Sequence, residues 1–424
     1  MKGRIGFDLA VGLGLRGLGA VSGFVLLWLI AKVNGSEAVG AYQLGLTTAT
    51  MLAVISVAGL DFLIIREAAV IVRRGTIGDL RETFTKGRRF ILCSGTACAL
   101  LMLVGGLSIY ALADAPNPLL YIILAFSPAV LLLALLRHSN ALLRSQGSVL
   151  LSQSLEGVLY TSIAAGVIAV LWLANSDVEP IALPLAYLAG LALATGISLF
   201  AARRLSRNWG EGTAQIDIPT GLRVTGAPIL MTSGEWLTLL AIGAIAGLSD
   251  AGIYRTAFMF CLLFQLVNAS FSTMAGPHIA KASAAGDRAG VMGITHKVGL
   301  IGLVMVAPLA ALCLVLPELL LGLFGEEFIA GALALQILAA AQTINVVFGP
   351  VGAALIMVGR ERQLLKIEVA ATSLAVILAL ALIPVLGFLG AAIGFACATI
   401  LRNAASRFIL SRWHPTPQPH EASA

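Results

Sequence analysis

Long stretches of uncharged, apolar residues run through this sequence and restrict it to a membrane fold. Charged residues make up 11% of the 424 residues, whereas an average soluble domain carries about 25%. A helix that crosses the hydrocarbon core needs roughly 20 apolar residues and satisfies its own backbone hydrogen bonds there. Twelve runs meet this criterion, at about 12–32, 41–65, 90–113, 119–143, 149–173, 181–202, 224–247, 252–275, 298–321, 330–357, 367–386 and 388–410. The sequence therefore predicts an all-α polytopic membrane protein with about twelve transmembrane helices.

A repeated motif divides these runs into two sets of six. The stretch Gly35–Tyr42 reads GSEAVGAY, and Gly247–Tyr254 reads GLSDAGIY at an offset of 212 residues, half the chain. The same offset aligns other distinctive residues, Gly147 with Gly359 and Glu156 with Glu368. Each copy is expected to form the outer turn between the first two spans of a lobe, with its glycines in the turn and its tyrosine at the membrane interface. An internal duplication is thus predicted, with six-helix lobes at 1–212 and 213–412 and a disordered cytoplasmic tail at 413–424.

Basic residues are concentrated in alternate connections, which predicts the orientation of the chain. The segment 66–89 contains seven Lys and Arg residues, while the intervening connections hold mainly Asp and Glu. Both termini are therefore expected in the cytoplasm. The formal net charge of +6 follows from this asymmetry, so it favours topology signals beside anionic membrane lipids over nucleic-acid binding.

No motif indicates an enzyme, a cofactor or a metal site. The G-x-G-x-x-G at Gly12, Gly14 and Gly17 opens a membrane span and follows no strand, unlike a dinucleotide-binding loop. The chain has no G-x-x-x-x-G-K-[ST], its five cysteines form no C-x-x-C, and its five histidines lack metal-ligand spacing. We therefore expect a transporter without ATP hydrolysis, whose energy comes from an H⁺ or Na⁺ gradient, from the substrate gradient or from another subunit.

Polar residues inside the spans are the candidates for function, because charge in hydrocarbon is costly. Arg16, Glu235 and Arg255 either line a cavity or form structural salt bridges, and Asp61 joins Glu235 as a candidate for ion coupling or a salt bridge. Residues nearer the cytoplasmic ends are expected to anchor at the interface or to form local ion pairs; they are Asp61, Arg137, His138, Glu156, Glu368 and Arg402. Amide side chains could meet sugar hydroxyls or bond helix to helix; they are Gln43, Gln265, Asn268, Gln342 and Asn345.

Five segments in order resemble the polysaccharide flippase family of the multidrug/oligosaccharidyl-lipid/polysaccharide (MOP) exporter superfamily. They read GSEAVGAYQLGLTTATMLAVISVAGLDFLIIREAA, GLSDAGIYRTAF, FGEEFIAGALALQILAAAQ, MVGRERQLLKIEVA and IPVLGFLGAAIGFA, and the resemblance spans about residues 5–410. It implies two six-helix lobes around a cavity that opens alternately to the two sides of a bacterial inner membrane. It further implies movement of undecaprenyl-diphosphate-linked oligosaccharide units to the periplasmic leaflet for lipopolysaccharide O-antigen, capsule or exopolysaccharide. A polymerase and a chain-length regulator would be partners, and Arg16 and Arg255 are the candidates for the cation-lined cavity.

Three alternatives stay open at this point. A multidrug exporter of the same superfamily would favour acidic residues in its cavity, whereas the candidate in the outer half of the spans is Arg255. A lipid II flippase is chemically close, although that branch usually has fourteen spans. A membrane glycosyltransferase or polymerase would need an acid or base on a large loop outside the membrane, and no loop predicted here exceeds about 25 residues.

Overall fold

The computed structural model describes residues 2–74, 77–112, 119–174, 178–210, 212–213 and 218–413, and every regular element among them is a helix. Ten of these helices are long and apolar enough to cross a membrane. The prediction of an all-α polytopic membrane protein is therefore confirmed.

One of the ten candidates is long enough for two membrane spans. It extends from Gly14 to Val57, but the backbone at Gly35 is not helical (φ 75°, ψ −173°). A straight helix of 44 residues would be about 66 Å long, twice the roughly 30 Å hydrocarbon core. Gly35 thus separates the two expected runs at 12–32 and 41–65. The expected seventh run falls in a further helix, Ile218–Ile245, which is not among the ten. The total of twelve spans and the side on which the termini lie stay predictions.

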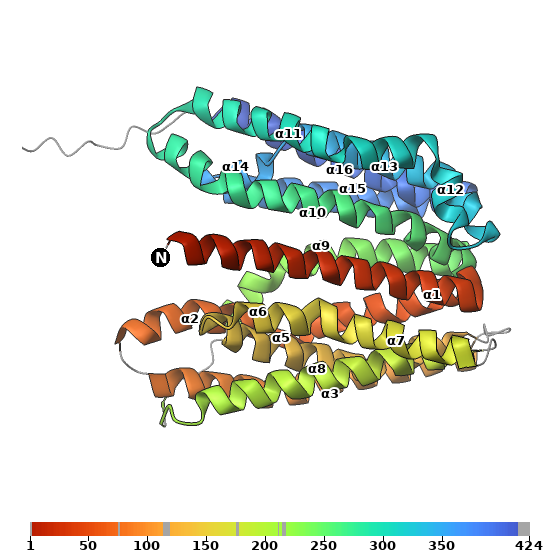
Figure 1. Cartoon of the computed structure of the whole chain (residues 1–424), viewed down its shortest axis with the longest axis horizontal. Coiled ribbons are helices and arrows are strands. Elements are labelled where there is room, and N and C mark those ends of the chain that lie inside the picture. Colours follow the sequence, from red (N-terminus) through yellow and green to blue (C-terminus); the bar gives the residue numbers. More distant parts are fainter. Residues whose placement is uncertain are drawn as a thin grey trace, which may run out of the picture. The chain divides into compact units, whose positions relative to one another are not determined.

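The chain forms two compact units, Met1–Gly243 and Ala244–Ala424 (Figure 1). The first, unit 1, contains α1 (Lys2–Val57), α2 (Leu60–Arg74), α3 (Ile77–Leu112), α4 (Leu120–Ala125), α5 (Ser127–Ser145), α6 (Val149–Gln153), the π-helix η1 (Ser154–Val158), α7 (Leu159–Ala174), α8 (Ala182–Ser206) and nearly all of α9 (Ile218–Ile245). The second, unit 2, contains α10 (Leu248–Ala284), α11 (Arg288–Val315), α12 (Pro317–Gly322), the 3-10 helix η2 (Glu326–Gly331), α13 (Ala332–Val347), α14 (Val351–Met357), α15 (Glu361–Leu386) and α16 (Phe388–Ser411). The lobe limits expected at 212 and 213 stay predictions. Trp413, the first residue of the expected tail, is buried in a core cluster, and 414–424 lie outside the described residues.

Each unit is built around one central helix. In unit 1, α5 packs against α1, α2, α3 and α8, and in unit 2, α13 packs against α10, α11 and α16. Twelve of the 19 residues of α5 are buried, including the polar His138, Ser139 and Asn140. A helix buried on most of its circumference must satisfy its polar groups within the protein, so α5 is where the polar contacts of unit 1 concentrate.

The repeated motif occupies equivalent places in the two units. Gly35 (φ 75°) lies at the kink within α1, and Gly247 (φ 105°) precedes α10. Both have the left-handed backbone that favours glycine, so the expected turn role is confirmed for the first glycine of each copy. The second glycine, Gly40 or Gly252, lies within a helix. The aligned pair Gly147 (φ 85°) and Gly359 (φ 72°) shares this geometry. The duplication seen in the sequence is therefore also a duplication of backbone conformation.

The tyrosine of the motif is buried within the protein, so the expectation that its ring is presented to the membrane interface was wrong. Tyr42 is 1% exposed and Tyr254 is 5% exposed. Tyr42 packs edge-on against Phe126, with the ring centroids 5.0 Å apart. Two helical turns separate the tyrosine from the turn glycine, which carries its ring about 10 Å away from the turn. In this position the ring contributes its apolar area to the core of the protein.

A break between α1 and α2 is a point of close contact with α9 in unit 1. The expected run 41–65 is interrupted after Val57, because Ala58 (φ 50°) and Gly59 (φ 75°) leave the helical conformation. A Cβ on Gly59 would overlap the carbonyl oxygen of Gly221, and a Cβ on Gly221 would overlap that of Ala58. The backbone of α9 therefore lies directly against the α1–α2 junction, without side chains between them.

Candidate functional site

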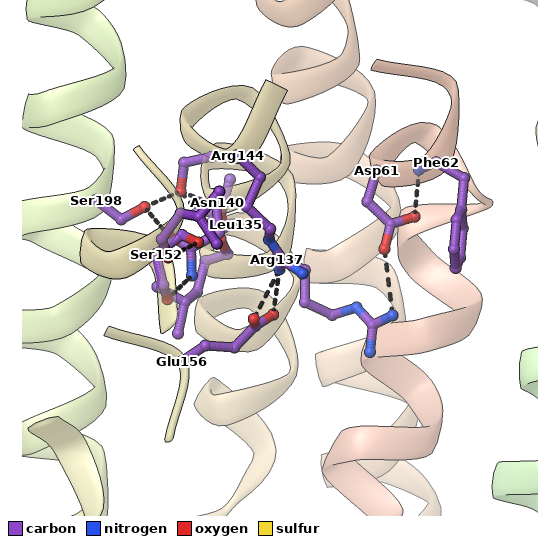
Figure 2. Close-up of polar contacts among 12 residues, drawn as sticks. Asp61, Phe62, Leu135, Arg137, Asn140, Arg144, Ser152, Glu156 and Ser198 are labelled. Atoms are coloured by element: carbon purple, nitrogen blue, oxygen red, sulfur yellow. Dashed lines mark hydrogen bonds and ion pairs between the residues drawn. The ribbon is translucent and has the colours of Figure 1, made fainter. Parts of the chain in front are cut away.

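Two arginines on α5 form the polar centre of unit 1. Arg137 and Arg144 are seven residues apart and so lie on one face of the helix. The Nη2 atom of Arg137 donates to Oδ2 of Asp61 on α2 at 3.2 Å, and that of Arg144 lies 2.6 Å and 2.7 Å from the two carboxylate oxygens of Glu156 (Figure 2). The two arginine side chains are 32% and 34% exposed. These are charge-assisted contacts of half-buried groups, so the local ion pairing expected at Asp61, Arg137 and Glu156 is confirmed.

Glu156 is presented by an irregularity in its helix. The π-helix η1 (Ser154–Val158) connects α6 to α7 and contains Glu156. One widened turn of this kind rotates the following side chains relative to an α-helix, and such turns occur frequently at functional sites. The hydroxyl of Tyr160 donates to the backbone carbonyl of Glu156 at 2.7 Å. Figure 2 shows the carboxylate of Glu156 directed at Arg144 of α5.

Arg16 of α1 belongs to the stripe of that helix that packs on the same segment. Gly12, Arg16 and Gly19 are spaced i, i+4 and i+7 and so share one face. A Cβ on Gly12 would lie 3.0 Å from Oε1 of Gln153, and one on Gly19 would lie 3.6 Å from the backbone of Gly157. The side chain of Arg16 is exposed, and within the described part of the chain it has no ion-pair partner. Arg16 is therefore an uncompensated cation on the face of α1 that meets η1.

Buried amide and hydroxyl groups join equivalent helices in the two units. In unit 1, Ser198 of α8 donates to Oδ1 of Asn140 on α5 at 2.7 Å. In unit 2, Nδ2 of Asn403 on α16 donates to Oδ1 of Asn345 on α13 at 2.8 Å, and Asn345 donates to Gln342 at 3.1 Å. Both cross-helix pairs are separated by 58 residues. Gln342 and Asn345 thus take part in hydrogen bonds between and along helices, one of the two roles expected for them.

The other predicted residues are distributed over α1, α9 and α10. In unit 1, Gln43 is buried in α1 and Glu235 is exposed on α9. In unit 2, Arg255 of α10 is half-buried, with its guanidinium carbon 5.7 Å from the centroid of the Phe258 ring, within the range of a cation–π contact. Further along α10, Gln265 is exposed and Asn268 is half-buried.

The other three ionisable residues expected near the cytoplasmic ends, Arg402, Glu368 and His138, have partners within the protein. Arg402 and Glu368 approach to 4.0 Å across α16 and α15. His138 is buried, its ring stacks on Phe84 at 5.0 Å between centroids, and its Nε2 lies 2.9 Å from the Phe84 carbonyl oxygen. The histidine is therefore a core residue between α5 and α3. It does not anchor at the membrane interface, which was one of the two roles expected for it.

Four residues of these contacts were not predicted from the sequence: Asn140, Ser198, Arg144 and Asn403. The two asparagines could have been found, because an amide within an apolar helix requires a partner. Ser198 could not have been found, because serine is common in membrane helices and its hydroxyl can donate to a backbone carbonyl of its own helix. Arg144 lies just beyond the expected run 119–143, and its partner Glu156 is carried by a π-turn that the sequence does not indicate.

Comparison with known proteins identifies the class of fold. No family model and no curated protein matches this sequence. Solved structures do match over most of the chain. An inward-facing multidrug resistance MATE family transporter of the MOP superfamily has a TM-score of 0.76 at 14% identity, covering 95% of this chain and 98% of that chain. The lipid II flippase MurJ, in an inward closed conformation, has a TM-score of 0.70 at 13% identity, covering 93% and 86%. A MOP superfamily transporter from Pyrococcus furiosus has a TM-score of 0.66 at 14% identity, covering 96% and 94%.

At these identities the likeness establishes the fold. The chain has the all-helical fold shared by MATE and MurJ, which is a fold of membrane transporters and flippases. Within that class the structural neighbours differ in substrate, because they include multidrug transporters and a lipid II flippase. The substrate has to be argued from the site itself.

Proposed function

We propose that this protein is a flippase that moves undecaprenyl-diphosphate-linked oligosaccharide units from the cytoplasmic to the periplasmic leaflet of a bacterial inner membrane. The observation that carries the proposal is the charge of the polar centre of unit 1. Asp61 and Glu156 are each engaged by an arginine, whereas Arg16 on the adjacent face of α1 has no such partner among the described residues. The surplus is positive, as an anionic headgroup requires.

A diphosphate is the kind of group that such a surplus suits. Its charges cannot enter hydrocarbon without replacement of their hydration. A guanidinium offers a planar fork of donors that matches phosphate oxygens, and amide side chains such as Asn268 provide partners for sugar hydroxyls. The polyprenyl tail is apolar and can stay in the lipid during transfer. Glu235 and Asp61 are the candidates for H⁺ or Na⁺ coupling, and a polymerase and a chain-length regulator are the partners that would use the product.

The same charge argument disfavours a cationic drug as substrate. For the Pyrococcus furiosus transporter, a binding pocket of reverse polarity is described as suggesting a different function. By analogy, the sign of the charge in the binding site distinguishes which substrates a transporter of this fold accepts. A cavity for cations needs uncompensated carboxylates, whereas both carboxylates of the polar centre are paired here.

The test is transbilayer movement in proteoliposomes. Purified protein is reconstituted with a fluorescent undecaprenyl-diphosphate oligosaccharide, and the fraction that becomes inaccessible to a membrane-impermeant quencher is followed with and without an ion gradient. Arg16→Gln and Arg255→Gln should each slow movement about tenfold or more, since a hydrogen bond to a charged group contributes about 1.5–3 kcal/mol. Arg362→Gln, which alters an exposed arginine at the start of α15, is the matched control.

Two other substrates, lipid II and a cationic dye, test the alternative functions in the same assay. Movement of lipid II at a rate equal to or above that of the oligosaccharide lipid would make the protein a peptidoglycan-precursor flippase instead. Accumulation of a cationic dye with neither lipid moving would make it a drug exporter, and the proposal would be rejected.

A further inference from the structure

A cavity of about 720 Å³ lies between α3 and α8 of unit 1 and is lined by five arginines. Arg81 and Arg88 come from α3, Arg203 and Arg204 from the last turn of α8, and Arg207 directly follows that helix. Both helices pack on α5. The cavity is at the ends of α3 and α8 that the sequence assigns to the cytoplasm. It uses none of the residues in the polar centre described above.

The charges at this cavity are not balanced by the described protein. Arg81 donates to the carbonyl oxygen of Gly210 at 2.9 Å. The other four guanidinium groups have no hydrogen bond or ion pair among the described residues, and no described carboxylate lines the cavity. Two carboxylates on the same turns of α3 are engaged elsewhere, since Asp79 accepts from the backbone of Thr213 at 2.8 Å and Glu82 pairs with Lys86 at 3.3 Å. Like charges held this close repel one another, so an anion in the cavity would lower the energy of the arrangement.

On the side of the cavity that faces the middle of α3 and α8, the rim is apolar. Phe200 lines the cavity and is 67% exposed. Leu193, Ile197 and Phe200 form one stripe of α8 that ends at the arginines, and Leu92 continues the Arg88 stripe of α3. All four apolar side chains are exposed. The surface thus changes from cationic to apolar along both helices, which matches a ligand with an anionic head and hydrocarbon chains.

We infer that this cavity binds the headgroup of an anionic phospholipid of the bilayer, with its acyl chains along the exposed stripes of α3 and α8. A headgroup with two phosphates matches arginines supplied by two separate helices. Basic pockets between transmembrane helices on the cytoplasmic side are suited to such lipids. Bound there, the lipid would join the ends of α3 and α8, which otherwise repel each other. The inference does not depend on which substrate the protein moves.

The experiment measures lipid binding to the full-length protein purified in detergent. Cardiolipin, a phospholipid with two phosphates, is titrated and counted by native mass spectrometry. The triple variant Arg88→Gln/Arg203→Gln/Arg207→Gln should bind it roughly 100-fold more weakly, at about fivefold for each arginine. The control triple variant Lys281→Gln/Arg288→Gln/Arg362→Gln removes the same charge from exposed positions of unit 2 and should bind like the wild type. An equal loss in both triple variants would overturn the site, because binding would then follow net charge alone.

Further variants keep the test decisive if the glutamine triple variant does not fold. Replacing the same three arginines with lysine keeps the charge and removes the bidentate fork, so its affinity should fall between those of wild type and the glutamine variant. Phe200→Ala changes an exposed side chain and should weaken cardiolipin binding. Wild-type affinity in both the lysine and the Phe200 variants would reject the proposed contacts.

Two competing ligands distinguish the source of the phosphate. Inorganic pyrophosphate supplies two phosphates without acyl chains and should not displace cardiolipin at equal concentration. Undecaprenyl diphosphate should not bind here in preference to cardiolipin. Displacement by pyrophosphate would mean a site for soluble phosphate, and exclusive binding of undecaprenyl diphosphate would mean a substrate site; either result overturns the inference.

Discussion

The contact between Gly221 and the α1–α2 junction allows a sharp test of the packing in unit 1. Gly221 is buried, and a Cβ at this position would overlap the carbonyl oxygen of Ala58 and lie 3.3 Å from Cδ1 of Leu63. The oxygen belongs to the backbone of a junction that is fixed by the left-handed conformations of Ala58 and Gly59. It cannot turn away as a flexible side chain would. Gly221→Ala should therefore force α9 away from the junction.

The magnitude follows from a comparison with a second glycine on the same helix. Gly226 is exposed, and an added Cβ would have no atom within 4 Å. Alanine favours the helix by about 1 kcal/mol over glycine at either position. Only Gly221→Ala adds the cost of overpacking, typically about 1–3 kcal/mol. Because propensity cancels in the comparison, the Gly221 variant should be less stable than the Gly226 variant by about 2 kcal/mol.

Apparent melting temperature in detergent, read from intrinsic fluorescence and from the monodisperse fraction after heating, measures the difference. For a unit of 243 residues, about 2 kcal/mol corresponds to roughly 4–8 °C. Gly226→Ala should melt at or slightly above the wild type. If Gly221→Ala melted together with Gly226→Ala, the close approach of α9 to the junction would be refuted.

Three further predictions concern polar contacts. Asp61→Asn should destabilise more than the double variant Asp61→Asn/Arg137→Gln, because it leaves a half-buried guanidinium uncompensated; melting temperatures of the full cycle should give a coupling of about 0.5–3 kcal/mol, and zero coupling would contradict the pair. Asn403→Leu should cost about 1–3 kcal/mol by depriving Oδ1 of Asn345 of its donor, so a variant with wild-type thermal stability would refute that bond's importance. Glu156→Gln removes the charge opposite its arginine and should tighten binding of a diphosphate headgroup about fivefold in a competition assay; unchanged affinity would separate this pair from the substrate site.

Part of the candidate site could be found from single residues. An arginine within an apolar run can be recognised from the sequence even when its partner is unknown. Arg16, Arg137 and Arg255 could therefore be predicted as polar residues of the spans. Their partners could not be assigned. Arg137 bonds to a carboxylate 76 residues away, and many acidic residues are equally available along the chain. The arginine cavity could not be predicted for the same reason, because its arginines come from two segments, 81–88 and 203–207, that are far apart in the sequence.

The sequence by itself determined the class of protein and its internal duplication. A membrane span depends on the summed hydropathy and charge of about 20 consecutive residues, which can be read directly from the sequence. The turn glycines also act locally, since a left-handed backbone is a property of one residue. Only the tertiary structure decided that Tyr42 is buried, that the second expected run breaks at Ala58 and Gly59, and which carboxylate each arginine meets. These outcomes depend on contacts between segments far apart in the chain, and no local pattern specifies which of several apolar faces will meet.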